Sequence, residues 1–211
     1  MTQRQHHSDR CRCAAESDIQ AVSELHIHAF EGHFLSRLGQ RFLNTMYRAF
    51  LNNSSGIFVV HESEQGTIDG FAVGVLASSS GDRRMAIKYL PQFMIATLPA
   101  AVRAPALIPR RLWRRFTDHA NSLEIPSDAV ILRSIGVSSS ARGTGAASSL
   151  LTHFEHVSQQ RGAQSVYLTT DEADNMRAQR FYTKHGYSLS TRFQQDETRA
   201  MWLMKKAIAL A

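Results

Sequence analysis

Apolar residues along the chain follow two spacings, and each spacing predicts one kind of element. Short apolar runs rich in β-branched side chains are typical of strands and occur at residues 10–15, 56–61, 68–76, 129–137 and 165–170. The runs at 56–61 and 68–76 flank a Glu-Gln-Gly turn, which predicts an antiparallel hairpin.

Spacings of three and four residues mark the helices. Ser17 and Asp18 are suited to cap the first helix, and a polar Asn-Asn-Ser-Ser-Gly stretch ends the second. The expected helices cover residues 17–29, 35–51, 146–161 and 175–185. A last hairpin is expected from strands at 187–193 and 199–204.

Composition is that of one globular domain. The chain has 211 residues, 43% of them hydrophobic, so we expect a single domain over 10–207 after a disordered tail at 1–9. The tail lacks the apolar stretch of a secretory signal, which favours a cytoplasmic protein. Cys11 and Cys13 are too close for an ordinary structural disulfide and too few for a zinc site, so we expect reduced thiols and no metal.

A glycine-rich turn joins the expected strand at 129–137 to the next helix. Glycine lets the backbone approach a ligand, and the first amides of a helix have no acceptor within the helix. These amides belong to Gly143, Thr144, Gly145, Ala146 and Ala147. Together with the helix dipole they predict an anion site, most naturally for a pyrophosphate. The turn is neither a Walker loop nor a complete Gly-x-Gly-x-x-Gly motif.

Two motifs in the same half of the chain point to one family. The turn reads Arg142-Gly-Thr-Gly-Ala-Ala, and a second segment reads Asn175-Met-Arg-Ala-Gln-Arg-Phe-Tyr-Thr-Lys-His-Gly-Tyr. They resemble the Gln/Arg-x-x-Gly-x-Gly/Ala and Asn-x-x-Ala-x-x-Phe-Tyr-x-x-x-Gly-Phe/Tyr motifs of the GNAT superfamily of acetyl-CoA-dependent N-acetyltransferases. The resemblance implies an α+β fold, with a central mixed sheet of about seven strands, about four flanking helices and a helical insertion.

The resemblance also implies which residues bind acetyl-CoA and act in the reaction. The expected contacts are Ile135, Gly136, Val137, Arg142, Gly143, Thr144, Gly145, Ala146, Ala147, Asn175, Ala178 and Tyr182. A main-chain amide at 135–137 would hold the oxyanion if the strand bulges there as in the family. Tyr182 stands where the family places the general acid, and a phenol is suited to protonate a departing thiolate.

The sequence does not mark the base that takes the proton of the attacking amine. Many relatives carry a glutamate early in the central strand, where this chain has Ile131. The remaining candidates are Asp171, Glu172, His28, Glu31 and His33. A chain of water molecules is an equal alternative.

Residues 80–118 lie outside the minimal pattern of the family. They carry eight arginines and lysines against two aspartates, a net charge of +6 that equals the formal charge of the whole chain. We expect short helices that cap the acceptor groove, while an anionic acceptor site and attachment to a membrane surface remain open. Binding of nucleic acid is disfavoured, because only Trp113 and Phe116 lie among the arginines.

The sequence therefore predicts an N-acetyltransferase that moves an acetyl group from acetyl-CoA to a primary amine of a small molecule, by direct attack in a ternary complex. The bulky insertion argues against the long groove of an enzyme that acetylates protein lysines or N-termini. The absence of the strand glutamate leaves a non-catalytic acyl-CoA-binding module as an alternative. The acceptor, the length of the acyl group and a homodimer are left open.

Overall fold

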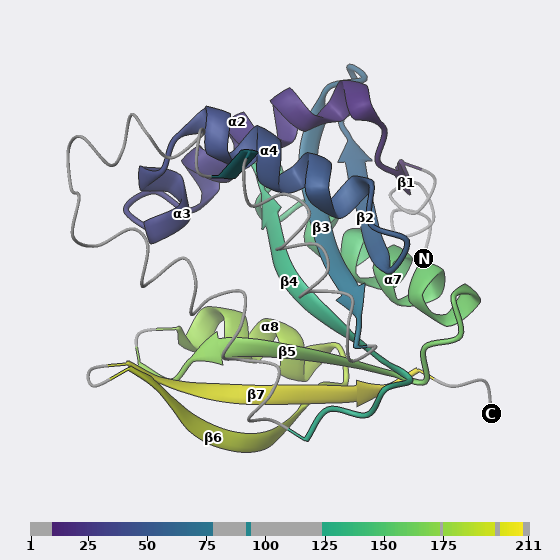
Figure 1. Ribbon diagram of the computed structural model, residues 1–211, viewed down its shortest axis with the longest axis vertical. Coiled ribbons are helices and arrows are strands. Elements are labelled where there is room, and N and C mark those ends of the chain that lie inside the picture. The colour runs from purple at the N-terminus through teal and green to yellow at the C-terminus, as the bar shows by residue number, and fades with distance from the viewer. Residues whose placement is uncertain (1–9, 78–91, 94–123, 174, 197–198, 209–211) are drawn as a thin grey trace.

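The computed structural model describes residues 10–77, 92–93, 124–173, 175–196 and 199–208 (Figure 1). The expected tail at 1–9 and nearly all of the basic insertion at 80–118 lie outside these residues. Both therefore remain predictions from the sequence.

A seven-stranded mixed sheet forms the centre, in the order β1-β2-β3-β4-β5-β7-β6. Its strands are β1 Cys11–Cys13, β2 Gly56–Glu62, β3 Ile68–Leu76, β4 Ala129–Val137, β5 Ser165–Asp171, β6 Ser188–Asp196 and β7 Arg199–Ala207. Neighbouring strands are antiparallel except β4 and β5, which are parallel. The predicted α+β fold with a mixed sheet is confirmed.

Helices cover both faces of the sheet (Figure 1). The helices among the described residues are the 3-10 turn η1 Glu16–Asp18, then α2 Ile19–Ala29, α3 Phe34–Arg37, α4 Gln40–Leu51, α7 Ala146–Gln160 and α8 Met176–Lys184. The first three α-helices pack on one face, and α7 and α8 pack on the other.

Strand β2 shows how the two faces are filled. Phe58 and Val60 belong to the core under α2 and α4, whereas Ile57 and Val59 belong to the core under α7. Successive side chains of a strand point to opposite faces, so an uninterrupted apolar run serves two cores at once. Strand β2 is therefore covered by helices on both of its faces.

The prediction of a single helix at 35–51 is wrong, because the segment forms two helices. Gly39 lies between α3 and α4 with a φ of 85°, in the left-handed region that a right-handed helix cannot include. The chain turns at this glycine, and α4 then buries Phe42, Leu43, Met46, Tyr47, Ala49 and Phe50 against the sheet.

The N-terminal region also differs from the expectation in detail. The first strand covers only Cys11–Cys13, and neither cysteine forms a disulfide within the described part of the chain; Cys11 is buried and Cys13 is exposed. Burial raises the pKa of the Cys11 thiol to about 12, so the thiol stays protonated. Asp18 occupies the N-cap position of α2, but its side chain makes no capping hydrogen bond to the helix. A 3-10 turn that ends at Asp18 precedes the helix.

Asp18 instead ties this turn to β1. Its carboxylate accepts hydrogen bonds from the backbone N–H of Ala15 at 2.8 Å and from the Arg12 guanidinium at 2.6 and 2.9 Å. The hydrogen bonds from Arg12 hold the pKa of the Asp18 carboxyl below its usual value.

Candidate active site

The sheet opens in its middle, between β4 and β5. Their parallel pairing runs from Ala129 opposite Ser165 to Leu132 opposite Leu168. β4 then continues beside β3 as far as Val137, so β4 and β5 separate beyond residue 132 (Figure 1). Main-chain groups of β4 beyond this point can therefore face a ligand.

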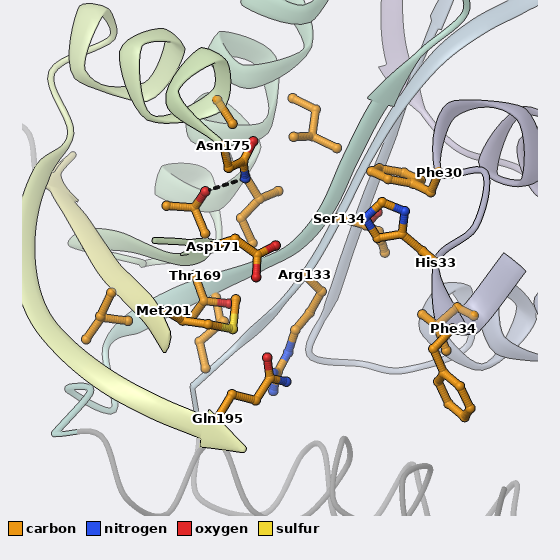
Figure 2. Close-up of a pocket in the computed structure, with 18 of the residues that line it drawn as sticks. Phe30, His33, Phe34, Arg133, Ser134, Thr169, Asp171, Asn175, Gln195 and Met201 are labelled. Atoms are coloured by element: carbon orange, nitrogen blue, oxygen red, sulfur yellow. Dashed lines mark hydrogen bonds between the residues drawn. The ribbon is translucent and has the colours of Figure 1, made fainter. Parts of the chain in front are cut away.

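A cavity of about 430 Å³ lies at this separation and takes side chains from both halves of the sheet (Figure 2). The polar residues that line the cavity are His26, His33, Arg133, Ser134, Thr169, Thr170, Asp171, Asn175, Tyr182, Gln195 and Arg199. Apolar side chains such as Phe30, Phe34 and Met46 complete the wall. The volume falls within the range of small-molecule sites.

A bulge in β4 borders the cavity. Val73 of β3 pairs with Ser134 and Gly74 pairs with Leu132, so Arg133 has no residue opposite it. The bulge thus lies two residues before the stretch 135–137 where it was expected. Glycine at position 74 lets β3 lie close to β4 beside the bulge, because a Cβ atom at this position would lie 2.5 Å from the Ile131 carbonyl oxygen.

The glycine-rich turn follows directly on β4 and leads into α7. Gly143 and Gly145 have φ values of 84° and 106°, in the region that favours glycine. Residues 142–145 are exposed, and the amides of Gly143 and Gly145 make no hydrogen bond to the described part of the chain. These amides and the start of α7 have the arrangement on which the anion site was predicted, and the site itself stays a prediction.

Local hydrogen bonds fix this turn. The backbone N–H of Ser138 donates to the Asp69 carbonyl oxygen at 2.8 Å, and the Ser138 hydroxyl accepts from the Ala141 N–H at 3.1 Å. The Thr144 hydroxyl donates to the Ala141 carbonyl oxygen at 2.9 Å. The turn is therefore ordered by the chain itself.

Helix α8 brings Tyr182 to the cavity. Burial raises the pKa of the Tyr182 hydroxyl above its usual value, so the phenol stays protonated at neutral pH. Two further residues of the same motif, Asn175 and Ala178, line the cavity with it. The Asn175 side-chain amide donates to the Thr170 hydroxyl at 2.8 Å, which joins the start of α8 to β5 (Figure 2).

Of the five candidate bases, Asp171 and His33 line the cavity, on opposite walls (Figure 2). Asp171 stands at the end of β5 and is held by two hydrogen bonds from Arg199, one of them with 2.7 Å between Nη2 and Oδ2. His33 is exposed, and its Nδ1 lies 3.3 Å from the Glu31 carbonyl oxygen.

The other three candidates do not line the cavity. Glu172 accepts two hydrogen bonds from the exposed Arg192 side chain, at 2.7 and 2.8 Å. These bonds hold the pKa of Glu172 below its usual value. His28 and Glu31 are exposed.

Among the expected cofactor contacts, Ile135 lines the cavity, while Gly136 and Val137 continue β4 toward the turn. Arg142 is exposed outside the cavity, at the start of the glycine turn. Ala146 and Ala147 form the first turn of α7, and Ala146 is fully buried.

Sequence reasoning missed several lining residues. Arg133 carried a signal, since a charged residue that interrupts an apolar strand requires a polar environment. Gln195 and Arg199 carried none, because only the return of the last hairpin beside β5 brings them to the cavity.

Among the described residues, no three histidine, cysteine or carboxylate side chains gather as a metal ion would require. In the same part of the chain, no helix has the length and apolar character needed to cross a bilayer.

Comparison with known proteins connects this geometry to a family. The model of the acetyltransferase (GNAT) family matches residues 19–187. No curated protein matches the chain in sequence.

Solved structures share the fold at low sequence identity. The ribosomal-protein-S18-alanine N-acetyltransferase from Escherichia coli has a TM-score of 0.59 and 13% identity, over 95% of this chain and 94% of that one. A phosphinothricin acetyltransferase from Sinorhizobium meliloti, solved in complex with AcCoA, has a TM-score of 0.61 and 13% identity, over 94% and 88%. Ard1 from Thermoplasma volcanium has a TM-score of 0.58 and 16% identity, over 95% and 97%.

The family match spans the glycine turn, both walls of the β4–β5 separation and the helix that carries Tyr182. The chain belongs to the acetyltransferase (GNAT) family of acyltransferases.

Proposed function

We propose that the protein transfers an acetyl group from acetyl-CoA to a primary amine of a small molecule. The observation that carries this proposal is the cavity at the β4–β5 separation, which is lined by Ile135 of the central strand and by Asn175, Ala178 and Tyr182 of the second family motif.

The residues present fit acetyl-CoA as co-substrate. The amides of Gly143 and Gly145, together with the start of α7, suit its diphosphate, and a side chain at either glycine would be strained. The strand edge beyond Leu132 suits the pantetheine arm, because its main-chain groups are not paired with β5. The relative from Sinorhizobium meliloti was solved with AcCoA, which supports the same donor here.

Chemistry at the thioester needs three groups from the chain. A main-chain amide of β4 beyond Leu132 donates to the carbonyl oxygen, where negative charge develops as the amine nitrogen attacks the carbonyl carbon. Tyr182 donates its proton to the sulfur as the carbon–sulfur bond breaks, so that CoA leaves as a thiol. The amine loses one proton, which a base must accept.

We assign this base to Asp171. Its carboxylate lies in the cavity at the end of β5, and Arg199 fixes its orientation. His33 lies on the opposite wall and is the second candidate. A comparison of variants at the two positions separates these candidates.

The size of the cavity favours a small acceptor over a protein segment. Its volume of about 430 Å³ and its mixed aromatic and polar lining suit a compact molecule. The fold is shared by an N-acetyltransferase that modifies a ribosomal protein, but at 13% identity this likeness extends only to the fold. A cytoplasmic location and a homodimer stay predictions from the sequence.

The test is amine-dependent release of CoA thiol from acetyl-CoA, measured over a panel of small primary amines and of peptides with free N-termini or lysines. We expect CoA thiol to be released with small amines at rates well above those with peptides. Binding of acetyl-CoA without release in any reaction would identify a non-catalytic module. Faster release with peptides would identify a protein acetyltransferase.

A further inference from the structure

The two halves of the chain line the cavity with different chemistry. The described lining contributed by residues 26–73 has no carboxylate, ammonium or guanidinium group, and its only polar side chains are those of His26 and His33. The rest of this lining, which we call the apolar wall, comprises Phe30, Phe34, Leu35, Met46, Phe50 and Val73. An ionic group of a ligand would lose hydration against the apolar wall and gain no ion pair from these six residues.

Phe30 holds its ring at a fixed place on the apolar wall. It is the residue at which α2 ends, and its ring lies so close to β4 that a Cβ atom at Gly136 would be 3.1 Å from it. The ring centroid lies 4.8 Å from that of His26 and 6.4 Å from that of Phe71. The Phe30 carbonyl oxygen accepts a hydrogen bond from the Ser36 hydroxyl at 2.7 Å. Contacts of the ring and of the backbone therefore preorganise this aromatic surface for a ligand.

The Phe30 ring also lies next to the strand edge proposed for the acyl donor. Gly136, on which the ring packs, follows Ile135, and Ile135 lines the cavity beyond the last β4–β5 pair at Leu132. Phe30 is half-buried and lines the same cavity, so a ligand can reach its ring. An acceptor bound there would contact the ring while its nitrogen approaches the thioester.

The groups proposed to accept and donate protons lie elsewhere in the cavity. Figure 2 shows Phe30 and His33 on one wall and Asp171 on the other. The nitrogen of the acceptor must lie toward Asp171, while the apolar wall receives the rest of the molecule. The acceptor therefore needs an apolar body and a short chain between this body and the nitrogen.

We infer that the acceptor is a primary amine carried on an aromatic ring by a short alkyl chain, and that this ring packs against Phe30. This inference rests on the proposed function and specifies its substrate class. Burial of the ring should strengthen binding roughly tenfold to a hundredfold over an amine without a ring. An aromatic ring is favoured over an aliphatic one, because edge-to-face or offset packing of two aromatic rings adds roughly twofold to tenfold beyond the buried area.

Matched amines test the substrate class. Phenethylamine is compared with cyclohexylethylamine, whose ring is apolar but not aromatic, with ethylamine, which has no ring, and with β-alanine and phosphoethanolamine, which are ionic. The measured quantity is kcat/KM from acetyl-CoA thiol release, calculated for the unprotonated fraction of each amine. We expect phenethylamine to exceed cyclohexylethylamine at least twofold and each of the other three amines at least tenfold.

Variants then assign the preference to Phe30. Phe30→Leu keeps an apolar side chain and removes the ring, so phenethylamine and cyclohexylethylamine should become nearly equal. Phe30→Ala should also lower the ratio of phenethylamine to ethylamine, roughly threefold to tenfold. A general loss of activity cancels in both ratios, and Tm shows whether each variant is folded. Phe193→Leu is the matched control, because Phe193 is likewise half-buried but does not line the cavity, and it should leave both ratios unchanged.

Binding measured without turnover separates this inference from the proposed function. Saturation-transfer NMR with CoA present compares phenethylamine, cyclohexylethylamine and β-alanine on the wild-type protein and on Phe30→Leu. Selective binding of phenethylamine that is weakened in Phe30→Leu supports the site even if no amine releases thiol, in which case the proposed function alone fails. Acetylation without a preference for phenethylamine, or a preference that both Phe30 variants retain, overturns the inference and leaves the proposed function standing.

Discussion

Tyr182 and Tyr187 pack ring against ring with centroids 5.6 Å apart, yet their hydroxyl groups differ in surroundings. The Tyr187 hydroxyl donates to Glu155 at 2.9 Å, and Glu155 also binds Lys206 at 2.5 Å. Tyr182 lines the cavity instead. The two tyrosines therefore form a natural pair for separating a catalytic hydroxyl from a structural one.

Tyr182→Phe should lower kcat roughly tenfold to a thousandfold, the effect of losing one general acid, and should leave the affinity for acetyl-CoA unchanged. Phenylalanine keeps the ring packing, so the comparison isolates the hydroxyl. Steady-state kinetics and calorimetry measure the two quantities. Tyr187→Phe is the control and should reduce stability more than turnover. Normal kcat in Tyr182→Phe, with chemistry rate-limiting, would contradict the assigned role.

The pH dependence of kcat tests the same hydroxyl. Because burial raises the pKa of Tyr182 above its usual value of about 10, the phenol stays protonated through the moderately alkaline range. Activity should therefore rise or stay level as pH increases toward about 10, while more of the amine becomes unprotonated. A fall in kcat centred near pH 9 in the wild type and absent in Tyr182→Phe would contradict the raised pKa.

Gly145→Val should abolish measurable binding of acetyl-CoA in calorimetry, because the side chain covers the amides at the start of α7. Gly162→Val is the matched control. Gly162 follows the same helix at its other end with a φ of 85°, so valine is strained there as well. Both variants should lose stability, but only Gly145→Val should lose the cofactor-dependent rise in Tm. Equal affinities of the two variants for acetyl-CoA would show that the glycine turn does not bind the diphosphate.

Asp171→Asn should lower kcat/KM about a hundredfold or more near neutral pH, with a smaller deficit at alkaline pH where the amine is already unprotonated. Glu172→Gln is the control, since Glu172 is also bound by an arginine of the last hairpin but lies outside the cavity. If His33→Gln lost most of its kcat/KM while Asp171→Asn kept normal activity, His33 on the opposite wall would be the base.

Asp18→Asn should lower the free energy of unfolding at neutral pH by about 1–3 kcal/mol, because the buried carboxylate accepts hydrogen bonds from Arg12 and Ala15. The lowered pKa of Asp18 means that its contribution is complete above about pH 4 and is lost as pH falls through the lowered value. Denaturant unfolding at several pH values should show that the difference in free energy of unfolding between the variant and the wild type becomes smaller at acid pH. Glu16→Gln, at an exposed pair with Arg48, should change stability little.

Local patterns predicted the sheet well because strand runs and turn residues act over short distances. The run at 129–137 is strand β4 at the same residues, and the Asn175 and Arg142 motifs lie where the expected helices begin. The prediction of one helix at 35–51 was wrong because Gly39 has a left-handed φ and interrupts the helix, although the apolar spacing continues on both sides of it. Its left-handed φ is a property of the folded turn, which spacing alone does not specify.

The candidate site was predictable only in part. Tyr182, Asn175 and Asp171 lie in sequence beside recognisable motifs, and the structure brings all three to one cavity. Gln195 and Arg199 reach it through pairing of β5 with β7, a contact between distant segments. The direction of Arg133 depends on the bulge, which arises from strand register and not from any residue pattern in β4 alone.

The most direct test of the account follows the acetyl group itself. The protein is incubated with acetyl-CoA labelled in the acetyl group and with the best amine of the panel, and the labelled product and the free CoA thiol are quantified together. The account predicts that label appears on the amine nitrogen in a one-to-one ratio with released thiol, and that Tyr182→Phe slows both to the same extent. Thiol release without labelled amine, or bound acetyl-CoA that transfers no label to any amine, would contradict it.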